Sequence, residues 1–495
     1  MIAKRSFATA LAQIWIPLLV LLLFGVYHGC ITFVNHWQFR TFAFDLGYYT
    51  HTVYEFGHLR LGEHVLENSI YWHTWGDHFE PILMLIGPLI HIFGAYTLLI
   101  VQWAAILIGA IGAFRYFQFR SEDKWLPVIA MAQFLAIWGN SSALSFDFHA
   151  VVLGAMVVPW LLLYFHKRDR LRLVISLLLL VACGEKVAFW GIFIFLGLAL
   201  LELRNRRQVM WALGGATFCL AWTAVSLKYV IPLFLRPDKV YQHFDFHVMG
   251  ESNAEVIVNC FKDPLKAIRL LYIAHRPELP ETKLLKVELW KMVALSGGIG
   301  LLRRPAYLLM LIPIIFTKMF NDADIRWGIN AHYSIEFVPI LCIALYEWVK
   351  DIRIPQLRRS VAVFMLILTA TSSIVSLSTR YVWSSRPENL NVFDPRHWER
   401  WEYDICNLEY ALTFVPPDVP VTASDRLVPH ISPRDKIYFF PTVKDAEYAV
   451  IQLILDTYPI PEDRCRQLYQ EMLGSGEWEE LWVSPEVGVL KRRHP

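Results

Sequence analysis

Five short polar clusters interrupt an otherwise apolar chain of 495 residues, and the first two carry residues suited to acid–base or metal chemistry. Asp45 stands in the tetrapeptide FDLG, and Asp77 and His78 stand in WHTWGDHFEP, residues 72–81. A carboxylate serves as a general base, and a carboxylate beside an imidazole suits a metal ion or a phosphate-bearing group. The structural alternatives are a helix N-cap for Asp45 and a polar turn ahead of an apolar helix for 72–81.

The other three clusters combine acids, cations and imidazoles where apolar stretches end. Their candidate residues are Asp147 and His149 in FDFHA, the adjacent Glu185 and Lys186, and Arg326, His332 and Tyr333 within 321–334. An ionisable group at membrane depth costs at least a few kcal/mol unless it is paired or faces a cavity. Glu185 and Lys186 therefore indicate a polar cavity, with a mutual ion pair as the alternative. Arg326 and the His332–Tyr333 pair are suited to contact an anionic group.

The composition indicates which class of protein positions these clusters. Hydrophobic residues make up 56% of the chain and charged residues 18%, with a mean hydropathy of +0.39. Soluble domains carry roughly 25% charged residues, so the composition indicates a membrane protein. The net charge is only +2, so the charge balance does not indicate a nucleic-acid partner.

Apolar runs near the length of a bilayer core predict eleven spans. They are 11–33, 97–117, 126–141, 149–165, 171–183, 187–201, 209–231, 290–301, 305–319, 334–349 and 360–381. The stretch 171–201 is too long for one crossing and has basic flanks, which predicts two helices folded at residues 184–186. The short apolar run 81–93 is a re-entrant helix, an interfacial helix or a further crossing.

Lysine and arginine collect in alternate connections, which the positive-inside rule places in the cytoplasm together with the N-terminus. All five polar clusters then lie on the outer side, in the first outer loop (34–80), at later span ends, and beyond the second large outer loop (232–289). Leucine and aromatic spacing predicts an amphipathic helix over 45–58 in the first loop. Residues 1–383 form the predicted transmembrane domain.

Residues 384–495 read as a soluble α/β domain on the outer side. This prediction rests on strand patterns at 436–440 and 448–455, a helix pattern at 462–473 and a terminal hairpin pattern. A disulfide between Cys406 and Cys465 is one option if this domain faces an oxidising compartment.

The order of these motifs resembles the bacterial membrane family called domain of unknown function 2079. The resemblance extends from about residue 40 to 455. It rests on six motifs in this order: FDLG, GDHFEPILMLIGPL, FDFHA, the Glu-Lys break, HYSIEFVPIL and ASDRLVPHISPRDKIYFFP. Members usually have a Lys-Glu-Asp-type motif where this sequence has Gly-Glu-Lys. The family in turn is similar to the polytopic glycosyltransferases of the C superfamily (GT-C).

That resemblance implies an all-α polytopic membrane protein of about 11–13 transmembrane helices, GT-C-like, with a small α/β soluble C-terminal domain, in a bacterial inner membrane. The implied reaction moves a sugar from a polyprenyl-phosphate carrier to an acceptor at the outer face. Asp45 would be the catalytic carboxylate, Lys186 and Arg326 would stabilise the leaving phosphate, and Asp77 and His78 would be the ligands of a divalent metal if one is used. The competing functions are a transporter or lipid-handling protein and a non-catalytic assembly subunit.

Overall fold

The computed structural model describes the backbone of residues 2–63, 66, 70–239, 244–276, 278–379, 386–400 and 402–493. The chain divides into two compact units. The helical unit consists of Met1–Gly29, Gln102–Tyr229 and Gln242–Asn391. The mixed unit consists of Cys30–Val101, Val230–Tyr241 and Val392–Pro495. The predicted domain boundary at residue 383 lies outside the described residues.

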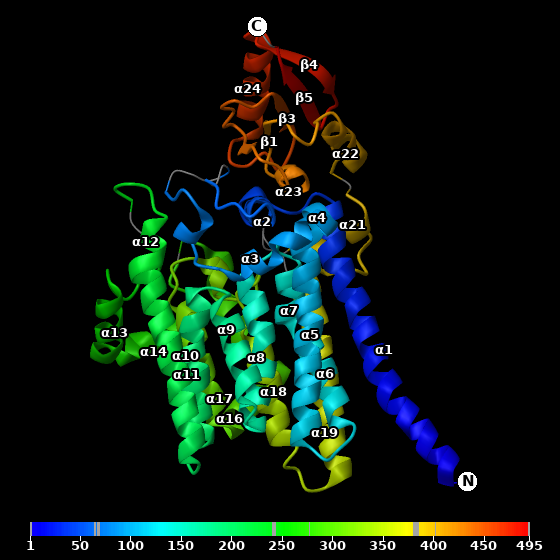
Figure 1. The fold of residues 1–495 in the computed structure, drawn as a ribbon, viewed down its shortest axis with the longest axis vertical. Helices are drawn as coiled ribbons and strands as arrows, with labels where there is room; N and C mark the ends of the chain where they lie inside the picture. Colours follow the sequence, from blue (N-terminus) through cyan, green and yellow to red (C-terminus); the bar gives the residue numbers. More distant parts are fainter. Residues whose placement is uncertain are drawn as a thin grey trace. The chain divides into compact units, whose positions relative to one another are not determined.

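The helical unit is built from helices (Figure 1), and residues 30–37 of α1 and 97–101 of α5 are assigned to the mixed unit. Its long helices are α1 (Ile2–Trp37), α5 (Thr97–Arg120), α6 (Leu126–Ala136), α8 (Ala150–Lys167), α9 (Arg170–Val181), α10 (Glu185–Leu201), α11 (Arg206–Val225), α17 (Pro305–Met319), α18 (Phe337–Val349) and α19 (Pro355–Ser378). Shorter helices are α7 (Trp138–Leu144), α13 (Asn253–Lys262), α14 (Pro264–Leu270), α15 (Leu285–Val293), α16 (Ile299–Arg303) and α20 (Pro387–Leu390).

Each of the eleven predicted spans coincides with a helix or with consecutive helices. Five described helical segments are long and apolar enough to cross a membrane, and three shorter apolar helices accompany them. The chain breaks between α9 and α10 at Gly184, whose φ of 120° is readily adopted only by glycine. The multi-span architecture and the fold at 184–186 are therefore confirmed.

The run 81–93 forms three short helical pieces, α3 (Ile82–Ile86), a 3-10 turn over Gly87–Leu89 and α4 (Ile90–Phe93). At 1.5 Å per residue they extend about 18 Å, less than the roughly 30 Å of a hydrocarbon core. They pack on α2 (Tyr48–Gly57), where a Cβ on Gly57 would lie 2.7 Å from the carbonyl oxygen of Gly87.

The C-terminal part of the mixed unit contains a five-stranded sheet with strand order β2-β1-β3-β5-β4. Strands β1 and β2 and strands β1 and β3 are parallel, and β5 pairs antiparallel with β3 and β4. The elements are α21 (Pro395–Trp398), α22 (Ile405–Thr413), β1 (Val421–Ala423), α23 (Val428–Ile431), β2 (Ile437–Phe439), β3 (Tyr448–Gln452), α24 (Glu462–Gly474), β4 (Trp478–Val483) and β5 (Val487–Arg492). The α/β prediction is confirmed, and β1 is an additional strand.

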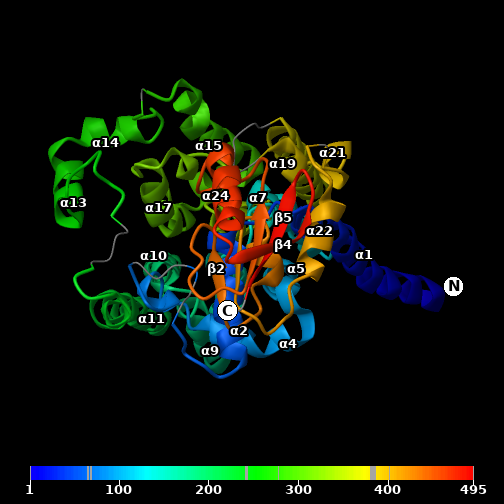
Figure 2. The same cartoon turned by 90° about the horizontal axis from the view of Figure 1, so that it is seen from above.

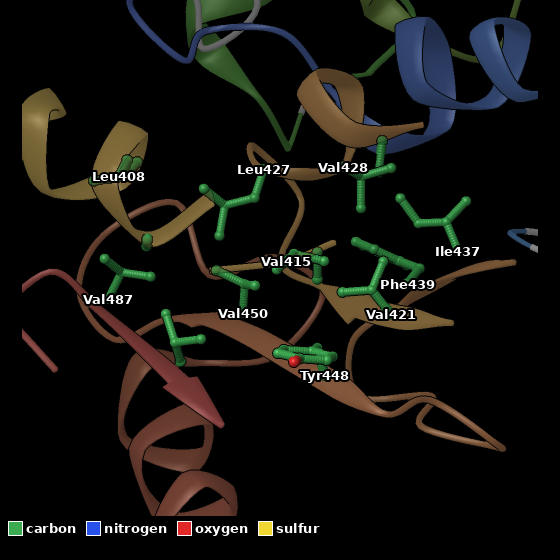
Figure 3. Packing of buried hydrophobic residues seen from close by; sticks show 14 of the residues in the cluster. Leu408, Val415, Val421, Leu427, Val428, Ile437, Phe439, Tyr448, Val450 and Val487 are labelled. Atoms are coloured by element: carbon green, nitrogen blue, oxygen red, sulfur yellow. The ribbon is translucent and has the colours of Figure 1, made fainter. Parts of the chain in front are cut away.

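Side chains that alternate along β3 build a core on each face of this sheet. Tyr448 and Val450 join the cluster on the face that α22 and α23 cover (Figure 3), whereas Ala449 and Ile451 pack with Tyr469 of α24. Helix α24 accordingly lies along the sheet when the C-terminal region is viewed from above (Figure 2). Cys406 is exposed, Cys465 is buried and both are free thiols, so the disulfide option is not realised.

Close helix packing in the helical unit depends on small residues, and Gly300 of α16 is the tightest case. A Cβ on Gly300 would meet the backbone of Ala344 and Leu345 in α18. We expect Gly300→Ala to destabilise the purified protein by about 1–3 kcal/mol, because the two helix backbones must separate. Thermal unfolding in detergent measures this loss. The matched control is Gly214→Ala, where a new Cβ has open space. Equal melting temperatures for the two variants would contradict the packing account.

Candidate active site

Asp45 lies in a π-helical turn, Ala43–Gly47, directly before α2. Gly47, not Asp45, is the N-cap of α2, so the capping alternative for Asp45 is wrong. The turn is fixed from the C-terminal region, because the backbone N–H of Ala43 donates to Oδ1 of the buried Asp425 at 2.9 Å. A Cβ on Gly47 would lie 2.7 Å from Cγ1 of Val428, which shows how closely the turn packs there.

Two buried tyrosines connect the first two polar clusters of the sequence. Burial raises the pKa of Tyr49 well above its usual value, and the charges of Glu80, Asp77 and Asp45 raise it further. Burial likewise raises the pKa of Tyr48, with Tyr71 and Asp77 contributing. The mixed unit thus brings Asp45, Asp77 and Glu80 into one acidic cluster around neutral phenols. Glu80 was not a predicted site residue, although it lies in the same motif as Asp77.

Asp77 and His78 follow a 3-10 turn, Thr74–Gly76, and their side chains are 4.0 Å apart. His73 begins that turn and accepts a hydrogen bond from the N–H of Trp75 at 3.1 Å. It is enclosed by Phe56, Trp75 and Phe234, and burial lowers its pKa to about 4. Within the described part of the chain, no three His, Cys, Asp or Glu side chains are grouped to hold a metal ion. Metal binding by Asp77 and His78 stays a prediction.

The predicted helix over 45–58 is present as the π-helical turn and α2, but its polar side is largely buried as well as its apolar side. Leu46 and Val53 are buried as expected, and Thr50, His51 and Thr52 are buried too. A ring nitrogen of His51 is 3.1 Å from the carbonyl oxygen of Arg434. The side that the sequence assigns to water is thus covered by residues almost 400 positions later.

Three side chains of the C-terminal region hold the backbone that leads to Asp45. Arg400 donates to the carbonyl oxygens of Gln38 (2.9 Å) and Phe39 (2.8 Å). Arg426 donates to the carbonyl oxygen of Arg40 at 2.7 Å. Both guanidinium groups also pair with the Asp456 carboxylate. With Asp425, these groups supply the partners that a buried, irregular backbone requires.

The remaining clusters meet in the helical unit. His149 is the N-cap residue of α8, and its ring stacks on that of His332 with centroids 3.4 Å apart. The ring of Tyr333 lies 4.1 Å from that of His332. Gln102 of α5 fixes the Asp147–His149 segment, donating to the carbonyl oxygen of Asp147 and accepting from the N–H of His149 at 2.7 and 2.9 Å.

Cations surround this histidine stack. The guanidinium of Arg326 lies 5.1 Å from the centre of the Tyr333 ring, and Nζ of Lys318 donates to the Tyr333 carbonyl oxygen at 2.8 Å. Burial lowers the pKa of His332 well below 6.5, and the charges of His149, Arg326, Lys186 and Lys318 lower it further. His332 is therefore neutral, and the positive charge resides on the neighbouring lysines and arginine. Asp245 pairs with Arg326 at 3.6 Å and offsets part of this positive charge, and the remaining excess suits the site to an anion.

Glu185 and Lys186 have different surroundings. Glu185 is buried at the start of α10 and its carbonyl oxygen accepts from the Thr223 hydroxyl at 3.4 Å, whereas Lys186 is exposed. Sequence reasoning missed Lys318, because a lysine in the last turn of an apolar helix looks like an end anchor. It also missed Asp425, although the surrounding ASDRLVPH was among the motifs of the resemblance.

Comparisons with known proteins agree with this architecture. A family model described as "Predicted membrane protein (DUF2079)" matches residues 35–478. ArnT from Cupriavidus metallidurans, in its crystal structure bound to undecaprenyl phosphate, is similar over 96% of this chain and 97% of its own, with a TM-score of 0.50 and 11% identity. Its apo structure has a TM-score of 0.41 and 12% identity, over 90% and 93% of the two chains. No curated protein sequence matches the chain. The likeness to the ArnT structure with bound undecaprenyl phosphate confirms the predicted fold class.

Asp425 makes the stability of the mixed unit dependent on pH. Burial raises the pKa of this carboxyl to about 6, and the charges of Asp456 and Asp45 add to the rise. Between pH 4 and 6 the folded state therefore keeps a proton that the unfolded state has lost. Stability should fall as the pH rises through this window, by up to about 3 kcal/mol.

Asp425→Asn keeps the oxygen that accepts from Ala43 but does not titrate. We expect melting curves of wild type to shift down between pH 4 and 6 relative to those of this variant. The exposed Asp463 in the first turn of α24 provides the control, and Asp463→Asn should follow wild type. Parallel curves for wild type and Asp425→Asn would contradict the raised pKa.

Proposed function

The chain belongs to the DUF2079 family of predicted membrane proteins, and we propose that it is a membrane glycosyltransferase that takes a sugar from a polyprenyl-phosphate carrier. The fold likeness to ArnT, a GT-C glycosyltransferase whose structure contains undecaprenyl phosphate, supports the donor class. The cationic group of Arg326, Lys318 and Lys186 provides the independent support, because a lipid phosphate needs positive charge where it binds.

The proposed chemistry is an inverting displacement. The acceptor hydroxyl oxygen attacks the anomeric carbon of the sugar while its proton passes to the Asp45 carboxylate. The bond from the anomeric carbon to the phosphate oxygen breaks, and polyprenyl phosphate leaves with the electron pair. In this proposal Arg326 and the lysines bind that phosphate, while Asp77 and Glu80 belong to the acidic group that keeps Asp45 in a polar setting.

The remaining predicted residues have supporting roles in this proposal. The proposed phosphate-binding cations lie around four of these residues, Asp147, His149, His332 and Tyr333. Glu185 places Lys186 at the break between α9 and α10. The acceptor, the sugar and the outer-face orientation stay predictions, as does a divalent metal at Asp77 and His78.

Asp45→Asn tests the catalytic role. This near-isosteric change removes the base, so we expect sugar transfer from labelled polyprenyl-phosphate sugars to fall by about 10²–10⁴-fold. Purified enzyme in nanodiscs is assayed with a panel of such donors and a membrane extract as the acceptor. Asp463→Asn is the control and should retain activity, and unchanged melting shows that both variants fold. Sugar transfer by Asp45→Asn at the wild-type rate would contradict the assignment of Asp45 as the general base.

Arg326→Gln tests donor binding separately from catalysis. Loss of one charge-assisted contact should weaken undecaprenyl phosphate binding about tenfold. The exposed Arg269 of α14 offers the matched control, Arg269→Gln. Binding is measured by native mass spectrometry with undecaprenol as the uncharged comparison. Equal affinity for undecaprenol and undecaprenyl phosphate would contradict a phosphate site. If the protein binds the donor but the transfer assay yields no product, a lipid-handling function would be favoured.

A further inference from the structure

A groove of about 400 Å³ runs between α9 and α11 of the helical unit, with α10 beneath it. Leucines of α9, Phe195 of α10 and the aromatic side chains of α11 line it almost entirely with apolar surface. Gly214 leaves part of the groove open, because a Cβ there would meet nothing within 4 Å, whereas Gly215 packs closely against the Phe195 ring. Met210, which lines the groove, and the nearby Leu171 are strongly exposed, as expected of side chains that face lipid.

One end of this groove is strongly basic. The connections 166–172 and 202–207, which lead into α9 and α11, carry seven lysines and arginines but only two carboxylates. Both carboxylates have cationic or imidazole partners: Asp169 pairs with Arg172 at 3.3 Å, and Glu202 lies 3.5 Å from His166. The excess positive charge at this end therefore has no acidic counterpart within these two connections.

Arg170 joins the basic end to the apolar groove. Its guanidinium lies 4.5 Å from the ring centre of Trp211, a groove-lining residue, and donates through Nη2 to Gln208. The buried Nη1 atom has no hydrogen-bond partner among the described residues. Arg170 is partly desolvated, and the nearby charges of Arg207 and Arg168 have the same sign as its own. An anion at Nη1 would accept its hydrogen bond and offset the repulsion between these arginines.

We infer that this groove binds one anionic glycerophospholipid of the surrounding membrane. One acyl chain lies in the apolar channel over Gly214, and the phosphate accepts hydrogen bonds from Arg170 beside Arg168 and Arg207. Basic pockets between membrane helices bind anionic head groups in this way. The apolar length of the groove selects a lipid over a soluble phosphate. The site is independent of the proposed sugar transfer and lies in the leaflet at the basic end of the bundle.

Native mass spectrometry of the purified full chain tests the site with phosphatidylglycerol, phosphatidylcholine and glycerol phosphate at equal concentrations. We expect wild type to retain one phosphatidylglycerol in preference to phosphatidylcholine. Arg170→Gln should reduce the affinity for phosphatidylglycerol about fivefold and remove the preference. Gly214→Leu, which fills the channel without a backbone clash, should reduce the binding of both lipids.

Two controls accompany these variants. Gly214→Ala leaves most of the channel open, and Arg303→Gln removes an exposed arginine outside the groove, so both should bind like wild type. Binding of glycerol phosphate as strong as that of phosphatidylglycerol would overturn the lipid assignment. Equal retention of the two lipids by wild type, or wild-type retention by Arg170→Gln and Gly214→Leu, would overturn the site.

Discussion

The backbone that carries Asp45 depends on hydrogen bonds from a part of the chain that follows almost 400 residues later. Residues 39–42 form neither helix nor strand, yet much of this segment is buried. Arg400, Arg426 and Asp425 accordingly contact the carbonyl oxygens of 38–40 and the N–H of Ala43. A buried backbone group without a partner is costly, so these side chains determine the conformation of the turn.

Charge of opposite sign collects in the two units. In the mixed unit, Asp45, Asp77 and Glu80 surround tyrosines whose ionisation they oppose. In the helical unit, cations surround a pair of stacked imidazoles, and His332 stays neutral because burial and the neighbouring charges oppose its protonation. A transferase with a phosphate leaving group needs both a proton acceptor and a phosphate-binding group. In the proposed reaction, the acidic group has the residue types for the first role and the cationic group has those for the second.

Sequence patterns predicted the local elements well and their surroundings poorly. The spans, the break at Gly184 and strands β2 and β3 follow from hydropathy, length and turn chemistry, all of which are properties of short segments. Helix α2 was placed correctly but with the wrong exposure, because His51 is covered by the backbone near Arg434. Strand β1 (Val421–Ala423) was not predicted.

The amino-acid sequence alone determined that this is a multi-span membrane protein, which segments are helical, and which polar clusters have the residue types for acid–base and phosphate chemistry. Only the tertiary structure decided which clusters meet: Asp45 with Asp77 and Glu80, and His149 with His332, Arg326 and Lys318. It also revealed the contact of Asp425 with Ala43. The physical reason is that helix formation and membrane insertion depend on neighbours in sequence, whereas these contacts form where packing brings distant segments together.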